Sequence, residues 1–129
     1  MTKEQTEFKY WGRDSDNMQI MIDNDNDLEI IVKEVDIDFA YIYVNDEKMK
    51  EFRKGIKRVL KGESDEYSFT CNEDGDDKLV FRRSDFYKGY MNVFTEGSSE
   101  VFTRFSFEDI KKLTKDLKSL RKIMKRDAE

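Results

Sequence analysis

The sequence contains no histidine, no proline and a single cysteine, and each absence excludes a class of chemistry. Without histidine there is no Ser-His-Asp or Cys-His pair and no histidine metal ligand. One cysteine cannot form an internal disulfide, and by itself it cannot supply a zinc site. Cys71 lies in a strand pattern and is expected to be a small core residue. We therefore predict a non-catalytic protein with no cofactor and no bound metal.

Long apolar runs are also missing. No stretch approaches the roughly 18 apolar residues that a transmembrane helix needs. The N-terminal segment Met1–Gln5 is polar and lacks the apolar region of a signal peptide. Together with the lone cysteine, these features predict a cytoplasmic protein that does not enter a membrane.

The residues that are present favour a folded chain. The 129 residues are 37% hydrophobic and 41% charged, but 13% are aromatic, including ten phenylalanines. A chain of this length is expected to form one domain, 1–129, with phenylalanine as the main core filler.

A shift of 61 positions superimposes the apolar pattern on itself without a gap. The helical stripe matches over four pairs: Met49/Ile110, Phe52/Leu113, Ile56/Leu117 and Val59/Leu120. Strand positions match in phase as well, including Phe8/Phe69, Ile20/Phe81, Val32/Val93 and Val44/Phe105. A chance alignment of two lysine-rich helices is the alternative, but strands and helices have different periods, and agreement in both favours a true repeat.

Each repeat reads as four strands followed by one amphipathic helix. In the first unit, 7–61, strands are expected at 8–11, 18–22, 28–35 and 39–44, with a helix from 46 to about 61. In the second unit, 68–122, they are expected at 66–72, 78–83, 90–95 and 100–105, with a helix after 106. The predicted fold class is α+β, with two pseudo-repeated antiparallel ββββα units whose sheet or sheets pack on the two amphipathic helices.

Local signals mark the ends of these elements. Asn45 and Ser106 are placed to cap the two helices, and Gly62 is placed to end the first. An Asp-Gly pair at 74–75 predicts a hairpin turn. Gly55 costs up to about 1 kcal/mol inside a helix and suggests close packing there.

The charge is segregated along the chain. The net charge is −5, yet segment 46–61 holds seven basic and three acidic residues, and segment 106–126 holds eight basic and three acidic residues. The helices are therefore basic and the strand regions acidic. A solvated helix face accounts for this pattern; a surface for an acidic partner or nucleic acid is the alternative.

The strand residues that point away from the helices are unusually aromatic. The candidate partner-binding residues on this outer face are Lys9, Trp11, Tyr41, Tyr43, Arg82, Tyr90, Phe94, Phe102 and Arg104. Aromatic residues and arginine are enriched where proteins bind other proteins. Two alternatives stay open: the other half of the protein covers these rings, or the strand phase is shifted by one residue, which would exchange the two faces.

The acidic segment Asp23–Glu34 partly fits a calcium-binding loop. Acids stand at positions 1, 3, 5 and 12, but Leu28 occupies the position that requires glycine, and the flanks read as strands. An acidic hairpin turn is the expected structure.

The predicted element order, four strands followed by a helix in two successive copies, resembles the topology of Pur-alpha, PC4 and Whirly proteins. The nearest local similarity is Phe105–Leu113, which resembles the strand-to-helix step of PC4-type domains. The resemblance implies single-stranded DNA or RNA on the outer sheet face, held by Lys9, Trp11, Tyr41, Tyr43, Arg82, Phe94 and Arg104. The chain departs from this pattern in its charge, because its pI is near 5.0 and phosphate binding normally needs a basic surface.

Small acidic chains of this composition are also similar to immunity proteins for bacterial toxins and to phage inhibitors of host defence. That resemblance implies a protein target, for example a basic nuclease or a defence protein. An inhibitor that binds a protein is our first hypothesis, and a binder of single-stranded nucleic acid is the second. A homodimer that covers its own aromatic face is a third alternative.

Overall fold

The computed structural model describes residues 5–35, 38–70, 77–97 and 100–128. The first half contains strands β1 (Glu7–Trp11), β2 (Asn17–Ile22), β3 (Leu28–Glu34) and β4 (Asp38–Val44), a short 3₁₀ turn at Arg13–Ser15, and helix α1 (Asp46–Leu60). The second half contains β5 (Glu66–Thr70), β6 (Lys78–Arg83), β7 (Tyr90–Glu96), β8 (Phe102–Ser106) and helix α2 (Phe107–Ala128). The predicted α+β fold with two ββββα units is confirmed.

Each unit forms its own antiparallel sheet. The first sheet has the order β1-β2-β3-β4 and the second β5-β6-β7-β8, so every strand pairs with its neighbour in sequence. The 61-residue shift holds closely: β2 begins at Asn17 and β6 at Lys78, and the helices begin at Asp46 and Phe107.

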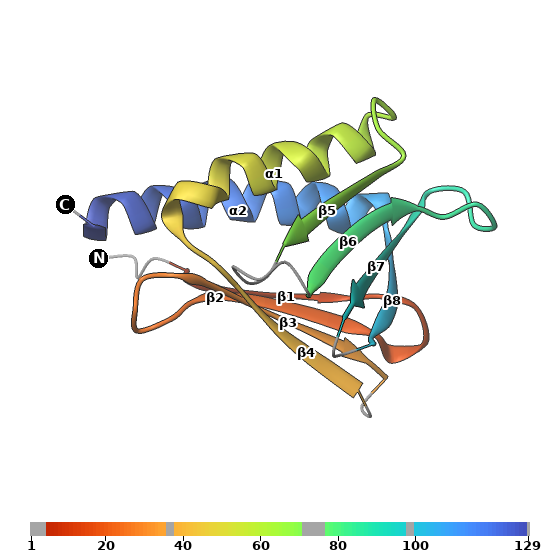
Figure 1. Ribbon diagram of the computed structural model, residues 1–129, viewed down its shortest axis with the longest axis horizontal. Coiled ribbons are helices and arrows are strands. Elements are labelled where there is room, and N and C mark those ends of the chain that lie inside the picture. The colour runs from red at the N-terminus through yellow and green to blue at the C-terminus, as the bar shows by residue number, and fades with distance from the viewer. Residues whose placement is uncertain (1–4, 36–37, 71–76, 98–99, 129) are drawn as a thin grey trace.

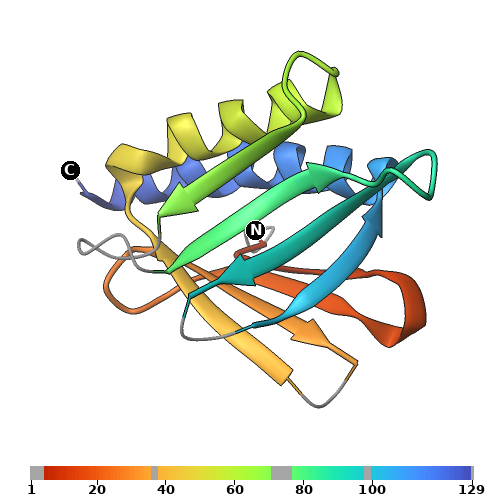
Figure 2. The same cartoon turned by 45° about the vertical axis from the view of Figure 1, so that its right-hand side comes forward.

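The two sheets and the two helices enclose one hydrophobic core. Figure 1 shows α1 and α2 side by side above the first sheet, and Figure 2 shows the second sheet beside them. The core draws on both repeats, and its largest fully buried side chains include Phe52, Phe81 and Phe105. Phe52 makes edge-to-face contacts with Phe69 at 5.1 Å and Phe81 at 5.9 Å between ring centroids. Helix α1 of the first unit is thus packed on the sheet of the second unit.

The predicted helix ends are confirmed. The Asn45 side chain accepts a hydrogen bond from the Lys48 amide at 3.0 Å. The Ser106 hydroxyl accepts one from the Asp109 amide and donates one to the Asp109 carboxylate. Gly62 has a φ of +78° and follows the last turn of α1, where the amide of Glu63 bonds back to the carbonyl of Arg58. This is the left-handed ending that glycine favours.

Position 55 has no room for a side chain, which explains the glycine there. A Cβ atom at this position would lie 2.3 Å from the ring of Tyr67, which packs across α1 from β5. We expect Gly55→Ala to destabilise the protein by about 1–2 kcal/mol, because the steric cost exceeds the gain of about 1 kcal/mol in helix propensity. Urea denaturation measures this. In the Tyr67→Ala background the same substitution should instead be stabilising, and an unchanged penalty there would contradict the explanation.

The sheets meet where the β1–β2 turn approaches the outer edge of β8. A Cβ atom on Gly12 would lie 2.3 Å from the carbonyl oxygen of Arg104. The carboxylate of Asp16, only 8% exposed, accepts hydrogen bonds from the amides of Val35 and Arg104 at 3.2 and 3.3 Å. Glu34 accepts one from the amide of Phe102 at 2.6 Å. Two carboxylates of the first unit therefore occupy the edge amides of Phe102 and Arg104, which blocks pairing with another strand at these positions.

Two sequence expectations lie outside the described residues: the burial of Cys71 and the Asp-Gly turn at 74–75. In the part of the chain that is described, no helix has the length and apolar character of a membrane span.

Candidate functional site

The outer face of the second sheet carries two rows of side chains set by the strand register. One row is Glu66, Arg82, Asn92 and Arg104, and the next is Ser68, Val80, Phe94 and Phe102. Alternate residues of a strand point to opposite faces, so these rows face away from the buried residues Leu79, Phe81, Met91, Val93 and Phe105. The predicted phase of these strands is therefore confirmed.

Rings and guanidinium groups pack against one another on this face. Phe94 and Phe102 stack with their centroids 5.7 Å apart and their planes inclined by 23°. The Arg82 guanidinium lies 5.4 Å from the Phe94 ring, and that of Arg104 lies 5.6 Å from the Phe102 ring. Arg82 also forms an ion pair with Glu66, and Arg104 donates a hydrogen bond to Asn92 at 3.0 Å. The two arginines are thus held in place by neighbouring side chains of the same sheet.

The stacked rings line an acidic hollow. We call it the aromatic hollow; its volume is about 400 Å³. Its lining residues are Phe94, Val101, Phe102, Thr95 and Gly97, together with the glutamates Glu34, Glu96 and Glu100. Phe102 remains 43% exposed. An apolar floor with three glutamates around it suits a positively charged group that carries an aliphatic or aromatic stem.

A second group of side chains, at the other end of β7, includes Tyr87 and Arg13, which the sequence did not predict as site residues. Tyr87 lies in the β6–β7 loop and packs edge-on against Tyr90, with centroids 6.3 Å apart. The guanidinium groups of Arg13 and Arg104 lie 4.3 and 4.4 Å from the Tyr87 ring. Arg13 and Tyr87 lie in turns, where strand alternation does not predict the direction in which a side chain points. Phe86, 90% exposed in the same loop, was also missed.

The first sheet presents a separate set of aromatic residues. The Lys9 ammonium lies 4.5 Å from the ring of Trp11, which is 58% exposed. Tyr41 and Tyr43, 52% and 51% exposed, lie on β4 at the opposite edge of this sheet. The structure therefore brings Arg82, Tyr90, Phe94, Phe102 and Arg104 into one surface, whereas Lys9 with Trp11 and the two tyrosines form two further patches.

Tyr43 lies next to the acidic β2–β3 turn. It lines a shallow hollow together with Glu29 and the acids of the 23–27 turn. Partial desolvation, followed by the charges of Glu29 and Asp23, raises the pKa of the Tyr43 hydroxyl. The Asp23 carboxylate accepts hydrogen bonds from the amides of Asp25 and Asp27, both at 2.9 Å. The segment forms the expected acidic hairpin turn, and among the described residues no cluster of metal-ligand type is present.

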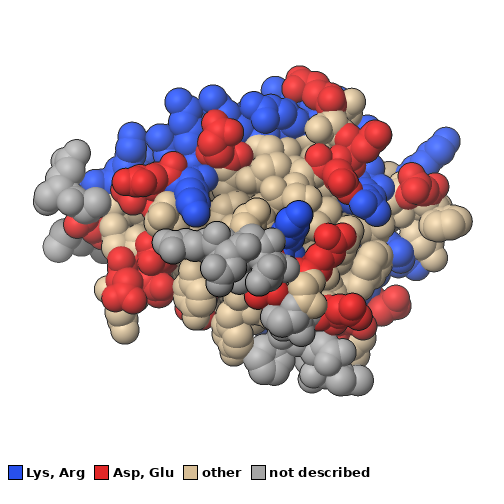
Figure 3. All heavy atoms as spheres, in the orientation of Figure 1, with Lys and Arg blue, Asp and Glu red and all other residues tan. Residues whose placement is uncertain are grey.

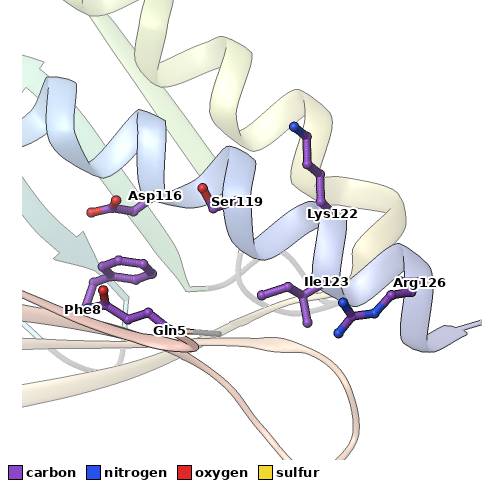
Figure 4. Close-up of a pocket in the computed structure, with 7 residues that line it drawn as sticks. All are labelled: Gln5, Phe8, Asp116, Ser119, Lys122, Ile123 and Arg126. Atoms are coloured by element: carbon purple, nitrogen blue, oxygen red, sulfur yellow. The ribbon is translucent and has the colours of Figure 1, made fainter. Parts of the chain in front are cut away.

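A third hollow lies between β1 and α2 (Figure 4). It is about 560 Å³ in volume and is lined by Gln5, Phe8, Asp116, Ser119, Lys122, Ile123 and Arg126. The Tyr10 hydroxyl donates a 2.5 Å hydrogen bond to the Asp116 carboxylate. Burial, followed by the Asp116 interaction, raises the pKa of Tyr10 well above its usual value. This pair joins β1 to α2, so its role is accounted for by packing.

Comparison with known proteins identifies a fold and no family. No protein-family model and no curated protein sequence matches the chain. A solved structure described as crystal structures of Trypanosoma bruciei MRP1/MRP2 is similar, with a TM-score of 0.59 and 10% sequence identity. The match covers 95% of this chain and 86% of that chain. The two therefore share an arrangement of elements, and at this identity the similarity extends to the fold alone.

Proposed function

We propose that this chain is a non-catalytic inhibitor that binds a basic protein target, in the manner of toxin immunity proteins or phage inhibitors of host defence. The observation that carries the proposal is the aromatic hollow, where the Phe94–Phe102 stack is surrounded by Glu34, Glu96 and Glu100. Stacked rings supply an apolar contact at low entropic cost, and the glutamates favour lysine or arginine on the target.

The overall charge supports the same proposal. The chain has a net charge of −5 although its helices are basic, so the excess of acidic groups lies in the strand and turn regions. A negative surface around the hollow would raise the rate of encounter with a basic partner. The packed arginines Arg82 and Arg104 supply the second residue type that is common at interface centres.

Removal of the ring stack should weaken target binding. We expect Phe94→Ala with Phe102→Ala to reduce affinity by about 30-fold or more, since truncating an interface centre costs about 2 kcal/mol or more. The wild-type protein would first be used to capture a stoichiometric partner from its native host. The purified pair would then be compared with the double variant by isothermal titration calorimetry.

Ile123→Ala is the matched control, because it also truncates a partly exposed apolar side chain but lies in the hollow between β1 and α2. It should leave affinity within about threefold. Glu96→Gln with Glu100→Gln should lower the association rate and reduce its salt dependence. Failure to recover any stoichiometric protein partner, or equal affinity of the ring variant and the control, would reject the proposal.

Single-stranded nucleic acid on the same sheet is the second candidate. It is favoured by the alternation of Arg82, Phe94, Phe102 and Arg104 across the face, since bases stack on such rings. The glutamates of the hollow oppose it by repelling phosphates. Fluorescence anisotropy with a labelled oligonucleotide tests this second candidate. It requires that Phe94→Ala with Phe102→Ala abolish oligonucleotide binding, and unchanged binding by the double variant would reject the candidate.

A further inference from the structure

A cluster of positive charge lies where the two helices pack together. We call this the helix seam and define it as Arg53 and Lys57 of α1 with Lys118 of α2. The Arg53 Nε group donates a 2.7 Å hydrogen bond to the carbonyl oxygen of Thr114, a residue 61 positions later in the chain. Lys57 and Lys118 are also 61 positions apart and close enough to interact electrostatically. Equivalent residues of the two repeats therefore meet here, which places the seam at their pseudo-two-fold axis.

The charges of the helix seam are not neutralised within the described part of the chain. The ion pairs found there are Arg82–Glu66, Lys111–Glu108 and Arg126–Asp127, and none includes a seam residue. The positive charges of Arg53 and Lys61, partial desolvation and the charge of Lys118 lower the pKa of Lys57. Clustering these cations without counter-charges costs free energy that an anionic ligand would recover.

Arg121, three residues after Lys118 on α2, contains a donor that lacks an acceptor. Its Nε atom is buried and has no hydrogen-bond acceptor among the described residues. An unsatisfied buried donor costs about 1–3 kcal/mol, and more when the group is charged. An acceptor for this donor would recover part of that cost, and the guanidinium adds a further positive charge to this stretch of α2.

The positive surface extends along both helices. Exposed lysines at 111, 115, 118, 122 and 125 follow one stripe of α2, which is about 21 Å long at 1.5 Å per residue. Figure 3 shows lysine and arginine gathered along the upper edge of the molecule, where Figure 1 places α1. A stripe of this length spans about six base-pair steps of a duplex at 3.4 Å each.

The residue types on this surface discriminate between two classes of anionic partner. A protein interface needs an apolar or aromatic centre and is depleted in lysine. The large exposed apolar residues in the described part of the chain are Trp11, Val35, Tyr41, Tyr43, Phe86, Tyr87 and Phe102, and all lie outside the helices. A surface of lysine and arginine without rings instead suits a phosphate backbone, which is bound by charge.

We infer that the helix seam binds the phosphate backbone of nucleic acid without regard to base sequence, on the face opposite the aromatic hollow. The chain would then hold a protein target on its sheet side and nucleic acid on its helix side. This inference does not depend on the proposed function, because it uses different residues and a different ligand.

Charge reversal at the seam tests the inference. A fluorescein-labelled duplex and a single strand of mixed sequence, about 20 nucleotides long, would be titrated at about 50 mM salt and above. We expect Lys57→Glu with Lys118→Glu to weaken binding by about tenfold or more and to reduce the slope of log K against log salt by about two. Phe94→Ala with Phe102→Ala should leave this binding unchanged.

Lys33→Glu with Lys88→Glu is the matched control, since it changes the net charge equally but lies on β3 and in the β6–β7 loop. It should weaken binding by less than about threefold. Circular dichroism checks that each variant is folded. If charge reversal disturbs folding, Lys57→Gln with Lys118→Gln replaces the charge-reversed pair. The inference is overturned if the wild-type protein binds neither oligonucleotide, if both charge-reversed pairs weaken binding equally, or if polyglutamate competes as well as the unlabelled oligonucleotide.

Discussion

Replacing Gly12 with alanine is expected to destabilise the protein by about 3 kcal/mol or more. The new Cβ atom would lie 2.3 Å from the backbone carbonyl oxygen of Arg104 and 3.2 Å from the ring of Phe105. Neither neighbour can yield cheaply, because one is the backbone of an edge strand and the other is a fully buried ring. The two sheets must therefore separate or β8 must shift. Urea denaturation followed by circular dichroism measures the loss.

Gly89→Ala distinguishes steric exclusion from backbone strain. Gly12 has a φ of −100°, which alanine adopts freely, whereas Gly89 has a φ of +79° and nothing within 4 Å of an added Cβ atom. Gly89→Ala should therefore cost only about 1 kcal/mol, from the left-handed conformation. If the Gly12 variant were no less stable than the Gly89 variant, the close contact between the sheets would be disproved.

Replacing Asp16 with alanine is expected to cost about 3 kcal/mol, because two amide groups lose their acceptor at once. The carboxylate accepts from Val35, directly after β3 of the first unit, and from Arg104 in β8 of the second, so it joins the two units directly. Burial raises the pKa of Asp16, while the hydrogen bonds from these two amides act in the opposite direction. The fold thus accepts the cost of burying the carboxylate in order to satisfy the edge amides.

Isosteric amides provide a graded test of this role. Asp16→Asn keeps one carbonyl oxygen and should retain part of the stability, with a loss of about 1–2 kcal/mol. Asp14→Asn removes a neighbouring exposed charge at a residue whose φ is +53°, a conformation that asparagine tolerates, and should change stability by less than about 0.5 kcal/mol. Hydrogen exchange at the amide of Arg104 should accelerate in the Asp16 variants alone. Equal exchange in the Asp14 variant would contradict the assignment.

Local signals were sufficient for the elements and their repetition. The apolar stripe of each helix, the caps at Asn45 and Ser106 and the ending at Gly62 depend on interactions within a few residues, so spacing along the chain predicts them. Strand phase was equally accessible, since alternation places Trp11, Tyr41 and Phe102 outside and Tyr10, Ile42 and Phe105 inside.

The candidate surface was predictable only in part. Phe94 and Phe102 could be assigned to one face from alternation, but their mutual stacking depends on the β7–β8 register. Arg13 and Tyr87 join the surface from turns, where no periodicity applies. Val80 shares the outer row with Phe94 yet is only 1% exposed, and strand alternation does not predict its burial.

The amino-acid order by itself determined two four-strand-and-helix units, their basic helices and their outward-facing rings, because each follows from periods of two or 3.6 residues and from charge content. Only the tertiary structure decided that Gly12 and Asp16 join the sheets, that glutamates surround the Phe94–Phe102 stack, and that Arg53, Lys57 and Lys118 meet at one seam. These contacts unite residues distant in the chain, and their geometry exists only after both repeats pack on a common core.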